Sequence, residues 1–216
     1  MSRNFAGWAL SSAQRQTNSH WVSLITRFAA RKECLNMTAT IPTVEYIKTD
    51  DVEKRAADVL RQHGLYSIPV DPVTLANRVG IKVHNAQFSD DALAGMIAKR
   101  GGAVTMLVNQ SDPPYRKRFT IAHELGHHFL HLLADGDYVD SAIDLFRDAE
   151  SPAGATDATG PRRAEIQANQ FAAALLMPAD LVREAFGKCE DLAELARLFN
   201  VSEAAMGFRL SRLGLG

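Results

Sequence analysis

Two histidines and a glutamate stand close together in a stretch of sequence that has the apolar spacing of a helix. The run His123-Glu124-Leu125-Gly126-His127 follows the pattern HExxH, in which the two histidines lie one helical turn apart and can bind one ion. Zinc accepts nitrogen ligands in this arrangement at about 2 Å. Glu124 would lie about 100° around the helix, where it can hold a water molecule beside the ion without binding the metal. The pattern therefore predicts a metal-dependent hydrolase with Glu124 as the base, the alternative being a helix that merely carries two histidines.

A catalytic zinc ion usually takes three protein ligands, and several residues could supply the third. Glu165 and Asn169 lie four residues apart in a second helical stretch, so both can face the first helix. Glu165 could be the third ligand, and Asn169 could hydrogen-bond a ligating imidazole. His131, one turn beyond His127, is a further candidate for a supporting role. Spacing alone does not decide this, because Glu165 could instead be a solvated residue at the start of a helix. Other acidic residues could also supply the third ligand, namely Asp137, Asp140, Asp148 and Glu150.

The elements that position these residues can be predicted from apolar periodicity and from turn signals. Strand-like runs lie at 81–88, 93–99 and 103–108, and Gly101-Gly102 between the last two is a hairpin signal. The helical period predicts helices over about 50–62, 72–79, 115–133, 161–177, from 178 onward, 190–199 and 202–212. Residues 134–160 show neither period and are expected to be irregular. This order predicts an α+β fold with a small antiparallel sheet, an active-site helix and a short C-terminal helical pair.

The chain divides by composition into three parts. Residues 1–36 carry five basic side chains and one acidic one, whereas the remainder carries 19 basic and 24 acidic side chains. This N-terminal extension is expected to be disordered, to precede a true start at Met37, or to be a docking helix or transit peptide, and no function is assigned to it. Residues 37–188 are expected to form the domain that carries the HExxH motif, and residues 189–216 a helix-turn-helix-like pair.

The overall composition excludes several classes of protein. Of 216 residues 46% are hydrophobic and 23% are charged, which favours a folded chain over a disordered one. The 24 basic and 25 acidic side chains nearly cancel, so no global field attracts nucleic acid or a membrane surface. Cys34 and Cys189 form neither a disulfide framework nor a metal knuckle, which favours the cytoplasm. No apolar run reaches the roughly 18 residues of a membrane span.

Two longer motifs surround the candidate site residues: Phe119-Thr-Ile-Ala-His-Glu-Leu-Gly-His127 and Glu165-Ile-Gln-Ala-Asn-Gln-Phe-Ala-Ala-Ala-Leu-Leu-Met-Pro178. Together they resemble the ImmA/IrrE family of zinc metallopeptidases. The resemblance extends over roughly 45–133 and 161–213. It implies a compact zincin-like fold and one Zn²⁺ per chain. It also implies that His123, His127 and Glu165 are the zinc ligands and that Glu124 is the catalytic base.

The same resemblance implies an endopeptidase whose substrate is a helix-turn-helix transcriptional repressor, in stress response or mobile-element regulation. The alternative is a DNA-binding or partner-binding regulator, or a toxin–antitoxin component, with a structural or vestigial metal site. Such a regulator would use the helical pair at 190–213, whose second helix offers only Arg209 and Arg212 as cations. We therefore expect this pair to pack or to dock protein, with direct nucleic-acid binding the lesser expectation.

Overall fold

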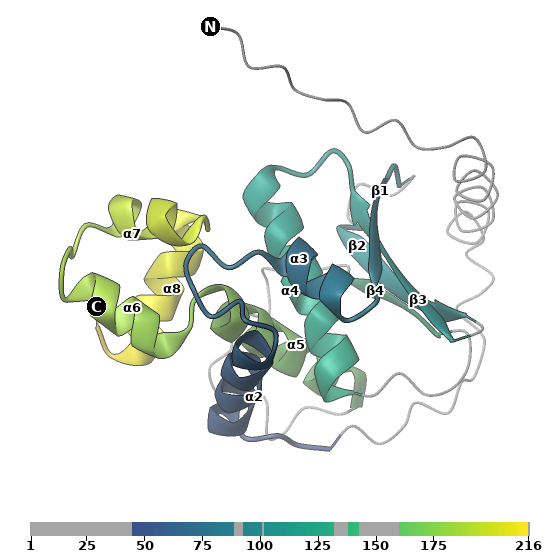
Figure 1. The fold of residues 1–216 in the computed structure, drawn as a ribbon, viewed down its shortest axis with the longest axis horizontal. Helices are drawn as coiled ribbons and strands as arrows, with labels where there is room; N and C mark the ends of the chain where they lie inside the picture. Colours follow the sequence, from purple (N-terminus) through teal and green to yellow (C-terminus); the bar gives the residue numbers. More distant parts are fainter. Residues whose placement is uncertain (1–44, 89–92, 101, 132–137, 143–159, 216) are drawn as a thin grey trace, which may run out of the picture. The chain divides into compact units, whose positions relative to one another are not determined.

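The computed structural model describes residues 45–88, 93–100, 102–131, 138–142 and 160–215 (Figure 1). The chain separates into two compact units, Met1–Ala39 and Thr40–Gly216, and every described residue belongs to the second. The described part holds helices and strands in one unit, so the expected α+β class is confirmed. None of the helices in these ranges is both long and apolar enough to cross a membrane.

Within the described ranges, the elements follow one another as two helices, three strands, a helix, a strand and four helices. Their bounds are α2 (Thr49–Gln62), α3 (Pro72–Arg78), β1 (Lys82–Ala86), β2 (Gly95–Arg100), β3 (Ala103–Asn109), α4 (Pro114–Leu130), β4 (Tyr138–Ala142), α5 (Gly160–Leu176), α6 (Ala179–Phe186), α7 (Leu192–Phe199) and α8 (Glu203–Leu213).

The sheet has the strand order β1-β3-β2-β4 and is mixed rather than wholly antiparallel. β2 and β3 form the expected hairpin, with Arg100 opposite Ala103 and a positive φ of 79° at Gly102. β1 lies on the other side of β3 and runs parallel to it. β2 runs opposite to β1 but is not its neighbour, since β3 lies between the two strands. β4 pairs antiparallel with β2 and lies within the stretch that was expected to be irregular.

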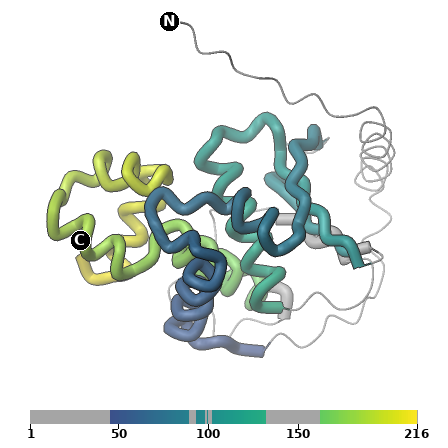
Figure 2. Tube along the Cα trace, viewed as in Figure 1, coloured from purple at the N-terminus to yellow at the C-terminus, as the bar shows by residue number. Residues whose placement is uncertain are grey.

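α4 is the central element of the described unit. It contacts β2 and β3 on one side and α5 on the other, and α2 packs against α5 in turn (Figure 2). Pro114, whose fixed φ suits a first helical turn, begins the helix. Residues 120–127 of α4 are all buried. A helix covered on every side must bury whatever its sequence carries, and here that includes His123, Glu124 and His127.

The C-terminal helices share the hydrophobic core of the rest of the unit. Phe199 of α7 and Met206 of α8 belong to the same cluster as Leu60 of α2, Leu125 of α4 and Phe171 of α5. The two helices are capped by the side chains of Asp191 and Ser202, which accept bonds from backbone N–H groups in the first turns. The domain boundary between 188 and 189 stays a prediction, with a continuous core on both sides of it.

Arg209 of α8 is one of the two cations considered for phosphate contact, and it is buried. Its Nε donates to the carbonyl of Met177 at 2.9 Å, and its two terminal nitrogens pair with the carboxylate of Glu53 in α2, Nη2 at 2.8 Å. The side chain of Arg209 is 1% exposed. A guanidinium held in this way joins α8 to α2 and is not placed to contact nucleic acid.

We predict that Arg209→Ala lowers the free energy of unfolding by about 3 kcal/mol, because it leaves Glu53 with an uncompensated, partly buried charge. Urea denaturation followed by circular dichroism measures the loss. Arg197→Ala is the matched control: Arg197 lies 3.9 Å from Glu194 and is 78% exposed, so its loss is expected to cost less than about 1 kcal/mol. Equal effects of the two changes would contradict the assignment of a structural role to the buried pair.

Candidate metal centre

His123 and His127 present one ring nitrogen each to a common point on the face of α4. The helical spacing of four residues brings the two Nε2 atoms to 2.9 Å from each other. Both side chains are buried, with His123 0% and His127 2% exposed. The HExxH prediction of two converging imidazoles therefore matches the geometry of the helix.

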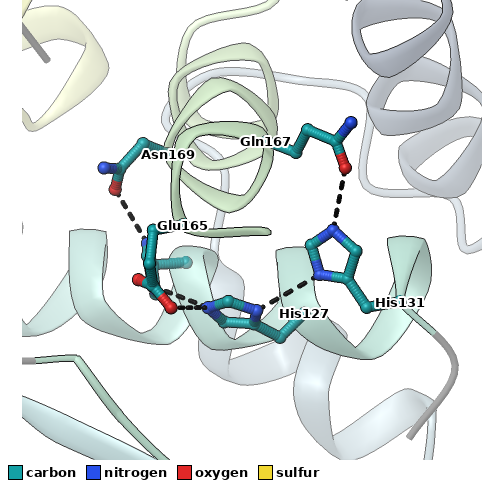
Figure 3. A network of polar contacts seen from close by, with 6 residues as sticks. His127, His131, Glu165, Gln167 and Asn169 are labelled. Atoms are coloured by element: carbon teal, nitrogen blue, oxygen red, sulfur yellow. Dashed lines mark hydrogen bonds and ion pairs between the residues drawn. The ribbon is translucent and has the colours of Figure 1, made fainter. Parts of the chain in front are cut away.

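Glu165 of α5 completes a cluster of three donor residues. Its Oε2 lies 3.2 Å from Nε2 of His123, and its Oε1 lies 3.4 Å from Nε2 of His127 (Figure 3). One donor atom from each residue lies within 4.8 Å of the others, so the three together could hold a metal ion. Of the competing acids, Asp140 lies in β4, whereas Asp137, Asp148 and Glu150 lie outside the described residues.

The donor set fits the metal that the motif predicts. In a tetrahedral zinc site with ligands at about 2 Å, neighbouring donor atoms lie about 3.3 Å apart. The observed separations of 2.9, 3.2 and 3.4 Å are close to this value. Two imidazoles and one carboxylate are a donor combination that zinc takes in catalytic sites. The side chain of Glu165 is 32% exposed, which leaves this side of the cluster open to solvent.

A glycine allows α5 to bring Glu165 this close. A Cβ at Gly126 would lie 2.9 Å from the Cα of Ala168 and 3.0 Å from its carbonyl oxygen. Real Cβ atoms do not approach other backbone atoms so closely, so any side chain at position 126 would push the helices apart. Since Glu165 and Asn169 lie on either side of Ala168 in α5, the contact sets the position of both relative to the histidines.

Side chains behind the cluster hold the two imidazoles in place. Nδ1 of His123 lies 2.8 Å from Oδ1 of Asn169, and Nδ1 of His127 lies 3.2 Å from Nδ1 of His131. An amide oxygen only accepts, so His123 donates through Nδ1 and its Nε2 keeps a free lone pair for a metal. The structure thus brings Asn169 and His131 next to the residues that they were expected to support.

The charges of the cluster also suit a metal ion. Burial lowers the pKa of His123, which favours the neutral imidazole that binds metals. Burial alone would raise the pKa of Glu165, but the imidazoles of His123 and His127 beside its carboxylate outweigh burial and hold that pKa well below its ordinary range. The cluster therefore offers a neutral nitrogen from His123 and a carboxylate anion from Glu165, with the imidazole of His127 beside them.

Glu124 is fully buried and stands outside the three-residue donor cluster. Its Oε1 would lie only 3.7 Å from a Cβ placed on Gly95 in β2, and that Cβ would also meet Thr120 of α4 at 2.4 Å. The absence of a side chain at Gly95 lets the sheet lie against α4 next to this carboxylate.

Gln167 is the site residue that the sequence did not indicate. It is 0% exposed, and its Oε1 lies 2.9 Å from Nε2 of His131. No spacing rule points to it, because two residues along a helix from Glu165 is about 200° around the axis. The available signal was weak: Gln167 stands between the apolar residues Ile166 and Ala168, and a polar side chain buried with such neighbours needs a partner.

Residues 76–211, more than half of the chain, match the family model described as the IrrE N-terminal-like domain. The chain belongs to this family. The resemblance to ImmA/IrrE metallopeptidases that the two motifs indicated is therefore confirmed.

Two curated relatives of this IrrE-like chain are radiation response metalloproteases. IrrE of Deinococcus deserti is 34% identical over 113 residues, which are 49% of this chain and 35% of the relative. IrrE of Deinococcus radiodurans is 33% identical over 113 residues, which are 49% of this chain and 30% of the relative. The chain spans about a third of the length of these relatives.

A solved structure shows the same fold. It is described as a Mycobacterium tuberculosis transcriptional regulator, shares 22% sequence identity with the IrrE-like chain, and superposes with a TM-score of 0.54. The match covers 77% of this chain and 47% of that one.

We predict that Gly126→Ala lowers the free energy of unfolding by about 1–3 kcal/mol and weakens zinc binding, because the added methyl group displaces α5 and with it Glu165. Urea denaturation and competition with a chelator measure the two effects. Gly207→Ala in α8 is the matched control: nothing lies within 4 Å of its Cβ, so it is expected to stabilise by up to about 1 kcal/mol. Zinc binding unchanged in Gly126→Ala would contradict the role given to the close contact.

Proposed function

We propose that this protein is a zinc-dependent endopeptidase that hydrolyses a peptide bond in a specific protein substrate. The observation that carries the proposal is the buried His123, His127 and Glu165 cluster with Glu124 beside it in the same HExxH turn. Membership in the IrrE family, whose curated Deinococcus relatives are named metalloproteases, supports it. We assign His123, His127 and Glu165 as ligands of one zinc ion per chain.

The residues in and around the cluster take different parts in the proposed hydrolysis. Zinc, when bound, polarises the scissile carbonyl and makes water more acidic. Glu124 takes the proton of the attacking water and passes it to the leaving amine, so that the peptide bond is cleaved without net consumption of a proton by the enzyme. Asn169 keeps the ring of His123 oriented through its bond to Nδ1. Glu165 contributes one negative charge, so a dication in the site keeps part of its charge for catalysis.

We further propose that the substrate is a helix-turn-helix transcriptional repressor and that cleavage acts in stress response or mobile-element regulation, in the cytoplasm. The substrate class follows from the resemblance to the ImmA/IrrE family. The names of the Deinococcus relatives, radiation response metalloproteases, support the stress-response part. A DNA-binding role is the weaker alternative, since Arg209 is buried against Glu53.

Metal content tests the ligand assignment. We expect about one zinc per chain in the parent protein and much less in Glu165→Ala, because two imidazoles alone hold zinc weakly. Inductively coupled plasma mass spectrometry of washed protein measures it. Glu184→Ala in α6 is the control, since Glu184 is exposed and pairs only with Lys188 among the contacts described. A full zinc complement in Glu165→Ala would remove Glu165 from the ligand set.

Cleavage tests the role of Glu124. We expect Glu124→Gln to keep its zinc and to cleave about 10²–10⁴-fold more slowly, because an amide cannot accept the proton of water. The measurement compares new protein N termini, by mass spectrometry, in cells that express the parent or the variant. New termini in a helix-turn-helix repressor would support the substrate class, and new termini elsewhere would correct it. Identical termini with both proteins would contradict the peptidase mechanism.

A further inference from the structure

A chain of hydrogen bonds runs from His127 away from the metal cluster and ends on the protein backbone. Nδ1 of His127 lies 3.2 Å from Nδ1 of His131, and Nε2 of His131 lies 2.9 Å from Oε1 of Gln167 (Figure 3). Nε2 of Gln167 donates to the carbonyl oxygen of Glu45 at 3.1 Å, in the segment that precedes α2. The chain thus connects a ligand on α4, through α5, to the start of the described unit.

The last of these bonds fixes the orientation of the Gln167 amide. A backbone carbonyl can only accept, so the NH₂ group of Gln167 must face Glu45 and its Oε1 must face His131. The reversed amide would place two oxygens against each other at 3.1 Å. Gln167 is completely buried, so water does not relieve such a clash.

The orientation of Gln167 in turn fixes the protons on both imidazoles. Because Oε1 of Gln167 only accepts, Nε2 of His131 carries a proton and Nδ1 of neutral His131 is an acceptor. That acceptor lies against Nδ1 of His127, which therefore donates. Nε2 of His127 is left with a lone pair, and this is the atom that lies 2.9 Å from Nε2 of His123 and 3.4 Å from Oε1 of Glu165.

We infer that His131 and Gln167 are positioning residues that hold His127 in its metal-binding tautomer and thereby set the affinity of the site for zinc. The inference rests on the proposed metal site. His123 reaches the same state directly through Asn169, whereas His127 reaches it through two further side chains and the Glu45 carbonyl. Partners of this kind contribute about 10-fold to 100-fold in metal affinity.

The test uses the full chain and compares Gln167→Met with Gln167→Glu. Methionine keeps the length of the side chain but presents no amide or carboxyl oxygen, so we expect zinc affinity, measured by competition with a chelator, to fall about 10-fold to 100-fold. In Gln167→Glu the buried carboxyl group is neutral, so it can donate to the Glu45 carbonyl and still present an oxygen to His131, and we expect it to keep the affinity within about threefold. Gln170→Met, three residues further along α5, is the matched control and is expected to bind zinc like the parent.

A second readout follows the tautomer itself. Nitrogen-15 NMR of the metal-free protein at about pH 8, where an ordinary histidine is neutral, is expected to show His131 protonated at Nε2 in the parent, in Gln167→Glu and in Gln170→Met. In Gln167→Met we expect His131 to exchange between its two tautomers. Should Gln167→Met fail to fold, His131→Phe removes the same acceptor from His127 and is expected to show the same loss of zinc affinity.

The possible failures are distinguishable. Equal zinc affinity of Gln167→Met and Gln170→Met, or a proton on Nδ1 of His131 in the parent, would overturn the inference while the metal site stands. A parent protein that takes up no zinc would overturn the proposed function, and the inference with it. Loss of affinity in Gln167→Glu as large as in Gln167→Met would show that only the packing of Gln167 matters, which also overturns the inference.

Discussion

The contact between α4 and α5 at Gly126 and Ala168 is the constraint on which the centre depends. The sequence places two imidazoles on one helix and a carboxylate on another, and neither helix alone holds a three-residue donor set. The backbones approach so closely at Gly126 that a single methyl group would not fit. The HExxH turn therefore has two functions, since it supplies two donors and also the gap that admits the third. The sheet repeats this device on the other side of α4, where Gly95 lies against Thr120.

The buried polar side chains of α4 need hydrogen-bond partners within the protein. His123 and His127 lie in the interior of the described unit. There, an imidazole without a hydrogen-bond partner would destabilise the fold by more than one hydrogen bond normally stabilises it. α5 supplies the partners for both, directly through Asn169 and, behind His131, through Gln167. α5 thus presents polar side chains to the histidines that α4 buries. Further along α5, Phe171 and Leu175 lie in the hydrophobic core, where the ring of Phe171 stacks on that of Phe129 in α4.

Much of this arrangement could be predicted from the sequence. The features that could not be predicted were missed for physical reasons. The HExxH spacing and the Glu165–Asn169 pair are local, so helical periodicity alone places them on shared faces. β4 was missed because its five residues, Tyr138–Ala142, include Asp and Ser and are too few to establish a period of two. The parallel pairing of β1 with β3 depends on a crossover that no local pattern encodes. Arg209 was considered as an exposed cation because nothing in its own helix reveals that Glu53, 156 residues earlier, lies opposite.

The separation of the donors along the chain has a thermodynamic consequence. His127 and Glu165 are 38 positions apart (165 − 127), so an ion bound to both closes a long loop and cross-links two helices in the manner of a disulfide. Unfolding would have to break that link, and metal binding would add to the stability of the folded chain by an amount that grows with the logarithm of the free metal concentration. A cross-link of this kind, unlike a covalent one, is reversible. The supply of the metal ion would then regulate how long the folded protein persists.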